Sequence, residues 1–457
     1  MKELTSGNPA KVLLSFALPI FVGMLFQQFY GMIDTVIVGR QIGVDAIAAV
    51  GATTYISNLL IGFMSGLTNG FAIITAKHFG ASDYERLRRA VGGTIVLGLM
   101  VSALFTVVSR IFLKDFLRLL NTPADIFDTS YSYISIILTF MTAAMLYNMA
   151  AGVLRAVGDS LTPLLFLMFS SFLNIVLDLL FMAKLGMGVE GAAYATVISQ
   201  TISFILCCVY IVRKFPFILP GIKELKITVH EALELLSMGL SMALMFSIVE
   251  VGSLVLQRAI NCFGTDTIAA HTAARKLSSI LMLPFSALSS ASATYCSQNL
   301  GAKKNDRIGK GVKSAVIIGF LWSAVVLFVG FVLAEPIIGL ITGTDDEYII
   351  GTASMYMRVN TPFYPILAVL SITRSSLQGI GKKAVPIASS FIELGGKAAA
   401  AFFLTPVLGY FGAMISEPIV WAFMTIILSI GYLTEIKKLN VSASENIITE
   451  EKTSEAY

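Results

Sequence analysis

The chain has 457 residues, of which 56% are hydrophobic and only 13% are charged, and its mean hydropathy is +0.82. These values exclude an ordinary soluble globular protein and predict a membrane protein. The four cysteines contain no C-x-x-C spacing and there are only three histidines, so neither a disulfide framework nor a zinc site is expected.

Apolar runs long enough to cross a bilayer recur along nearly the whole chain, since a hydrocarbon core of roughly 30 Å needs about 20 helical residues. The first run is too long for the apolar part of a cleaved signal peptide, and we expect it to stay in the protein. We predict twelve membrane-spanning helices, at residues 12–38, 46–76, 90–113, 128–150, 164–183, 188–212, 232–257, 267–298, 312–333, 349–373, 385–406 and 410–434.

The basic residues are distributed unequally between the two ends of these helices. One side, which includes both termini, carries most of the lysines and arginines. The opposite side carries only Arg40, Arg110, Lys114, Arg118 and Lys184. By the positive-inside rule we expect both termini in the cytoplasm. The formal net charge of +4 then reflects membrane topology and does not indicate a nucleic-acid partner.

The sequence is repeated internally. "GVDAIAAVGATT" from Gly43 aligns with "GTDTIAAHTAAR" from Gly264, and "KHFGASDYERLRRA" from Lys77 aligns with "QNLGAKKNDRIGKG" from Gln298, both at an offset of 221 residues. Because each unit has an even number of helices, the two copies cross in the same sense and form a parallel repeat.

The repeat and the polar segments around it divide the chain into four parts. We expect an amino-terminal six-helix lobe at residues 8–212 and a cytoplasmic linker at 213–231. A carboxy-terminal six-helix lobe follows at 232–434, with a cytoplasmic tail at 435–457. The expected fold is therefore an all-α integral membrane protein with two bundles around a central cavity.

Four segments together resemble the multidrug and toxic compound extrusion (MATE) family. They are "LPIFVGMLFQQFYGMIDTVIVGR", "GVDAIAAVGATT", "GVLRAVGDSLTP" and "NIVLDLLF", and the resemblance extends from about Asn8 to about Leu433. It implies twelve helices in two bundles that face each other as a V. It also implies cation-coupled efflux of drugs and other amphipathic organic compounds.

A carboxylate in the membrane interior is costly and indicates a functional site. Asp34 lies six residues before Arg40, and Asp178 lies six residues before Lys184, so both are about 9 Å below the outer surface. Asn174 lies one turn deeper than Asp178 on the same face. Thr196 is at a similar depth on the helix that follows.

We predict that Asp34, Asn174, Asp178 and Thr196 form a cation-coupling site. The alternative is that the two acids only reach toward the interface from helix ends. The resemblance implies the same roles for Asp34, Asn174 and Asp178, and less directly for Thr196. Two neighbouring carboxylates in a low dielectric favour binding of a proton, whereas neutral oxygens beside them suit sodium. The coupling ion is expected to be H+ or Na+, with no other metal and no cofactor.

Glu250 is expected about 12 Å below the outer face, where it could attract a cationic substrate or pair with a basic residue. It resembles an acid of one prokaryotic branch of the family, but the run at 349–373 lacks the acid that accompanies it there. This difference weakens the case for a second cation site. Other residues expected to line the substrate cavity are Gln28, Tyr30, Tyr147 and Phe246.

Several other polar residues lie within the apolar runs. Glu393 and Lys397 have the i, i+4 spacing of a structural ion pair. His271 is expected to be a hydrogen-bonded spacer, and the role of Glu417 stays open. Pro19 interrupts the first helix, as either a moving hinge or a static kink.

The predicted function is export of amphipathic, often cationic, organic compounds by a proton- or sodium-coupled antiporter. The alternative is a flippase for lipid-linked oligosaccharides of the same superfamily. The chain lacks a P-loop and a catalytic constellation, so we do not expect an enzyme. The expected partners are small organic substrates and membrane lipid, the expected location is the bacterial cytoplasmic membrane, and the expected state is a monomer.

Overall fold

The computed structural model describes residues 3–119 and 122–454, which form helices and connecting turns with no strand. The first eight α-helices are α1 Pro9–Gln41, α2 Val44–Gly80, α3 Tyr84–Leu119, α4 Phe127–Thr139, α5 Met141–Ala156, α6 Leu161–Asp178, α7 Gly188–Lys214 and α8 Val229–Ile260. The other eight are α9 Thr265–Gly301, α10 Asn305–Phe328, α11 Ala334–Thr342, α12 Glu347–Asn360, α13 Tyr364–Gly379, α14 Ala384–Ala399, α15 Thr405–Leu408 and α16 Tyr410–Ser454.

Within the described ranges, ten helices are long and apolar enough to cross a membrane, and the bent pair α4 and α5, with an angle of 44° between them, makes an eleventh. The predicted run at 349–373 corresponds to α12 and α13, which are separated by a 3-10 turn at Thr361–Phe363. Pro362 lies in this turn and removes a backbone donor, so the span is divided into two short helices. The prediction of an all-helical membrane protein is confirmed.

Local backbone features repeat at the same offset as the sequence. A π-helix at Leu179–Lys184 begins directly after Asp178, and another at Ala400–Leu404 begins directly after Ala399. Ser82 and Lys303, the two non-glycine residues with positive φ in the described chain, both have a φ of 56°. Each pair is 221 residues apart, so the duplication extends to the backbone.

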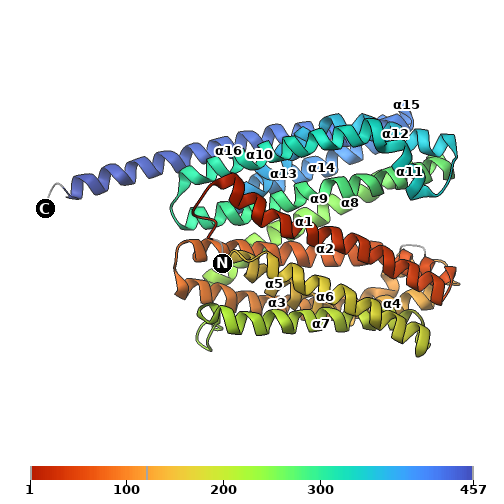
Figure 1. Ribbon diagram of the computed structural model, residues 1–457, viewed down its shortest axis with the longest axis horizontal. Coiled ribbons are helices and arrows are strands. Elements are labelled where there is room, and N and C mark those ends of the chain that lie inside the picture. Colours follow the sequence, from red (N-terminus) through yellow and green to blue (C-terminus); the bar gives the residue numbers. More distant parts are fainter. Residues whose placement is uncertain (1–2, 120–121, 455–457) are drawn as a thin grey trace. The chain divides into compact units, whose positions relative to one another are not determined.

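The helices divide into two compact units, and the division cuts through two helices. Unit 1 comprises residues Val22–Phe246, and unit 2 comprises Glu3–Phe21 together with the residues from Ser247 onward. Within each unit the helices run side by side (Figure 1). The beginning of α1 therefore packs in unit 2, whereas the beginning of α8 packs in unit 1. The change of unit in α1 falls next to Pro19, and α1 is continuous through that proline.

Within unit 1, glycines bring α2 and α8 into close contact. A Cβ added to Gly70 would lie 2.5 Å from the Gly239 Cα, and a Cβ added to Gly66 would lie 2.7 Å from the Ala243 Cα. Both contacts are with backbone atoms, which cannot move aside as a side chain can. Small residues at such positions are typical of helix packing in membranes.

We predict that Gly70→Ala destabilises the protein by about 1–3 kcal/mol, because the added methyl group forces α2 and α8 apart. Thermal unfolding of the purified protein in detergent measures the effect. The control is Gly62→Ala, also in α2, where an added Cβ meets no atom within 4 Å. Equal melting temperatures for the two variants would show that the close contact does not limit stability.

Candidate functional site

Three helices of unit 1 bring a cluster of polar side chains together. Tyr30 and Asp34 lie on α1, Asn174 and Asp178 on α6, and Thr196 on α7. Asn174 and Asp178 are buried, at 1% and 0% exposure. The four residues predicted to form the cation-coupling site are therefore adjacent in space, and Tyr30, predicted to line the substrate cavity, joins them.

Asn174 links the cluster through both ends of its amide. In the orientation that satisfies its neighbours, its Nδ2 donates to Asp178 Oδ2 at 2.8 Å and to the Tyr30 hydroxyl at 2.9 Å. Its Oδ1 accepts a hydrogen bond from the Thr196 backbone N–H at 3.0 Å. This orientation follows from the hydrogen-bond network around the amide. Asn174 thus ties α6 to both α1 and α7 at the level of the acids.

The carboxyl groups of Asp34 and Asp178 lie close enough to interact with each other. Two neighbouring carboxyl groups in a low dielectric repel each other when both are ionised, so the pair favours uptake of a proton or another cation. The Oδ1 atom of each acid is buried and has no hydrogen-bond partner. Neither acid forms an ion pair with a lysine, arginine or histidine of the described chain.

These residues fit a monovalent cation. The two carboxyl groups offer negative charge, and two of their oxygens are buried without a partner. The Thr196 hydroxyl is a neutral oxygen of the kind that hard cations prefer, and the Asn174 amide offers another when it turns so that Oδ1 instead of Nδ2 faces Asp178. The described residues contain no group of three or more His, Cys, Asp or Glu side chains that could hold a metal, so a transition-metal site is not indicated.

Tyr133 of α4 is a further polar residue near Asp34 and Asp178. The predicted site did not include it. Tyr133 lies five residues into the predicted run 128–150, which is about 8 Å along a helix. Its depth therefore matches that of the two acids, and the same depth arithmetic would have identified it.

A cavity of about 110 Å³ lies next to this cluster, between α2, α4, α5 and α7. Thr196 and Tyr133 line it, so the cavity adjoins the acid pair. Its other polar lining residues are Ser57, Asn148 and Gln200, and its apolar lining includes Met64, Met141 and Met145.

None of the residues predicted for a substrate cavity lines this one, Tyr30 included. Gln28, Phe246 and Glu250 are exposed. Tyr147 packs against a hydrophobic cluster of unit 1, and its hydroxyl donates to the Pro163 carbonyl at 3.3 Å. Their contact with substrate stays a prediction.

Unit 2 contains a buried ion-pair network at Glu393. Lys397 Nζ lies 3.1 Å from Glu393 Oε1, and Arg374 Nη2 lies 3.4 Å from Glu393 Oε2. Lys397 also donates to Ser253 Oγ at 3.1 Å, which joins α14 to α8. The predicted Glu393–Lys397 pair is confirmed, but Arg374 was not foreseen as a second partner.

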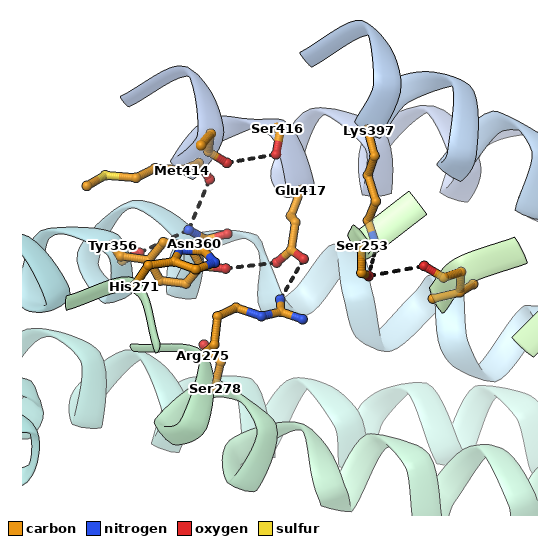
Figure 2. Close-up of polar contacts among 12 residues, drawn as sticks. Ser253, His271, Arg275, Ser278, Tyr356, Asn360, Lys397, Met414, Ser416 and Glu417 are labelled. Carbon is orange, nitrogen blue, oxygen red and sulfur yellow. Dashed lines mark hydrogen bonds and ion pairs between the residues drawn. The ribbon is translucent and has the colours of Figure 1, made fainter. Parts of the chain in front are cut away.

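A second buried ion pair in unit 2 joins α9 to α16 (Figure 2). Arg275 Nη1 donates to Glu417 Oε1 at 2.6 Å, and the Tyr356 hydroxyl donates to Glu417 Oε2 at 3.0 Å. The nearby His271 Nδ1 is hydrogen-bonded to the Tyr410 hydroxyl at 3.0 Å. His271 is therefore a hydrogen-bonded spacer, as predicted, and Glu417 is a paired acid.

We predict that Glu393→Gln destabilises the protein by about 3–5 kcal/mol, because Arg374 and Lys397 lose their common counter-charge. Lys397→Met should cost about 1–3 kcal/mol, since Glu393 keeps Arg374. Thermal unfolding in detergent ranks the stability losses of the two variants. Arg118→Met serves as the control, because Arg118 forms an exposed pair with Asp115 that contributes little. A larger loss for Lys397→Met than for Glu393→Gln would contradict the network.

Comparison with known proteins gives matches over most of the chain. The sequence model of the family described as MatE matches residues 19–180 and 237–403. Probable multidrug resistance protein YoeA of Bacillus subtilis (strain 168) is 27% identical over 428 residues, which cover 91% of this chain and 92% of YoeA. Probable multidrug resistance protein YpnP of the same organism is 28% identical over 381 residues, which cover 83% of this chain and 84% of YpnP.

Solved structures share the fold. One is described as the outward-facing conformation of a multidrug resistance MATE family transporter of the MOP superfamily. It aligns with a TM-score of 0.89 at 23% identity, covering 96% of this chain and 98% of that one. A MOP superfamily transporter from Pyrococcus furiosus Vc1 (DSM3638), described as having a binding pocket of reverse polarity, aligns with a TM-score of 0.88 at 22% identity and the same coverage. The predicted all-helical membrane fold, with the twelve helices of MATE transporters, is confirmed.

Proposed function

Because the chain belongs to the MATE family of multidrug efflux transporters, we propose that it exports amphipathic organic compounds, often cationic, in exchange for a proton or a sodium ion bound at Asp34 and Asp178. The observation that carries this proposal is the pair of acids, Asp178 buried and Asp34 half-buried, without a basic partner in the described chain. A cation that neutralises the acid pair must therefore come from solution. The relatives named as multidrug resistance proteins support the choice of substrates.

An exchanger requires that the cation and the drug favour different states of the protein. The cavity next to the acid pair supports such a link, because Thr196 both lines the cavity and belongs to the predicted cation-coupling site. Its volume of about 110 Å³ is below the roughly 300–1,000 Å³ of drug-sized sites. A drug therefore needs a more open arrangement of α2, α4, α5 and α7. A cation on the acid pair would hold α1, α6 and α7 together and oppose that opening.

The neutral oxygens at the site bear on which cation binds. A proton needs only the two carboxyl groups. A sodium ion needs several oxygen ligands, and the Thr196 hydroxyl and an Asn174 amide turned so that its Oδ1 faces Asp178 would supplement the acids. We therefore propose that the two ions compete for this site and that protons displace sodium.

The proposal places the chain in the bacterial cytoplasmic membrane as a monomer with both termini in the cytoplasm. The support is the excess of lysine and arginine on one side of the predicted helices. The coupling ion is the only bound group that the proposal requires. In this orientation Asp34 and Asp178 lie in the outer half of the membrane, where an ion enters from outside.

We predict that Asp34→Asn or Asp178→Asn abolishes cation-driven export while the protein still folds, because each change removes charge but keeps shape. Drug export from proteoliposomes under an imposed proton or sodium gradient measures the effect. The matched control is Asp125→Asn, an exposed acid of the same unit, which should keep full activity. Export by Asp178→Asn with an unchanged gradient dependence would overturn the coupling role. Absence of export for every cationic compound by the unaltered protein would favour the flippase.

Asn174→Ala separates the two ions. It removes a neutral oxygen that sodium needs, so sodium-driven export should fall at least about tenfold, the effect of losing about 1.4 kcal/mol of binding free energy. Proton-driven export by the same variant should persist and is the internal control. Equal losses under both gradients would mean that Asn174 only supports the structure.

A further inference from the structure

The two repeated units balance their buried acids in different ways. In unit 1, Asp34 and Asp178 have no basic partner in the described chain. In unit 2, Glu393 is paired with Lys397 and Arg374, and Glu417 is paired with Arg275. Unit 2 therefore supplies the counter-charges of its buried acids from its own side chains.

The internal repeat relates the two sets of residues. Gly191 aligns with Gly412 at the offset of 221 residues, and the same offset places Thr196 against Glu417 and Asp178 against Ala399. Unit 2 thus lacks an acid at the position of Asp178. It has one instead at the position of Thr196, on the last helix of the repeat. Both units therefore have an acid at corresponding depth, but in unit 2 the carboxylate is on the last helix of the repeat, at the position of Thr196, and not at the position of Asp178.

Both carboxylate oxygens of Glu417 have hydrogen-bond donors. Oε1 accepts from Arg275 and Oε2 accepts from Tyr356, so each carboxylate oxygen has a donor (Figure 2). The Glu417 side chain is 8% exposed and that of Arg275 is 39% exposed, so the arginine closes the solvent side of the acid. This differs from Asp34 and Asp178, each of which has one buried oxygen without a partner.

We propose that Arg275 is a resident cation that masks a second cation site at Glu417. The guanidinium stays protonated at all physiological pH values, so it holds the place that an exchangeable proton or sodium ion would take. Lys397 and His271 also act on Glu417, but Lys397 is held by Glu393 and Ser253, and His271 by Tyr410. Arg275 is thus a positioning residue that ties α9 to α16.

This inference deepens the proposed function and rests on it in one respect: unit 1 holds the exchangeable cation. Unit 2 then adds no cation to the exchange, and removal of Arg275 exposes a cation site at Glu417. An unpaired carboxylate in a low-dielectric interior takes up a proton or a small cation. The change should therefore create a cation site where the unaltered protein has none.

The test uses full-length protein in which Asp34→Asn and Asp178→Asn silence unit 1, so its result does not depend on the proposed function. Arg275→Gln in this background should gain one cation per chain. Two probes at neutral pH report it: the infrared carbonyl band of a protonated carboxyl group, and binding of radioactive sodium. Arg275→Gln combined with Glu417→Gln is the matched control and should gain neither signal. Arg275→Lys keeps the charge and should also gain neither.

Two results would overturn the inference. One is a Glu417-dependent signal already present with Arg275 intact, since the acid would then exchange a cation beside the arginine. The other is the absence of both signals in Arg275→Gln. If Arg275→Gln does not fold, the number of cations exchanged per drug is compared between the wild type and the double variant Arg275→Gln with Glu417→Gln. An equal ratio supports a masked site, and a lower ratio in the double variant contradicts it. Failure of cation coupling in the wild type would instead refute the proposed function.

Discussion

The arrangement of unit 1 depends on two carboxyl groups that lie close to each other inside a helix bundle. Asp34 and Asp178 come from α1 and α6, and no basic side chain of the described chain compensates them. In a low dielectric such a pair stays together only when a cation reduces its repulsion. Asn174 hydrogen-bonds Asp178 and also contacts Tyr30 of α1 and Thr196 of α7, so it links the acid pair to both helices. The cation that we propose for this pair would therefore act directly on the packing of three helices.

Unit 2 has the same architecture but different electrostatics. Its π-helix after Ala399 repeats the one after Asp178, yet no acid stands at that position. Glu393 is instead neutralised by Arg374 and Lys397, and Glu417 by Arg275, which joins α9 to α16 across 142 residues of sequence. A buried pair of this kind is difficult to separate, so it favours one fixed arrangement. A duplicated fold thus contains one unit in which Asp34 and Asp178 have no basic partner in the described chain and another in which Glu393 and Glu417 have one.

Much of this could be predicted from the sequence, because two signals in it are strong. Apolar run length set the spans, and depth along each helix placed Asp34, Asn174, Asp178 and Thr196 at one level. Partners that depend on helix rotation could not be predicted: depth does not reveal that Tyr30 faces Asn174 or that Arg374 reaches Glu393. The break at Pro362 divided a span that looked continuous by hydropathy. The three-way contacts of Glu417 required knowledge of how α9, α12 and α16 pack.

The central claim is that the acid pair of unit 1 takes its counter-charge from solution. Equilibrium binding of radioactive sodium to the purified wild-type protein, measured at several pH values, tests this claim most directly. The account predicts one sodium ion per chain at neutral to alkaline pH, displaced as the pH falls and protons occupy the same carboxyl groups. Binding that does not change with pH, or the absence of binding together with no measurable uptake of protons over the same range, would contradict it.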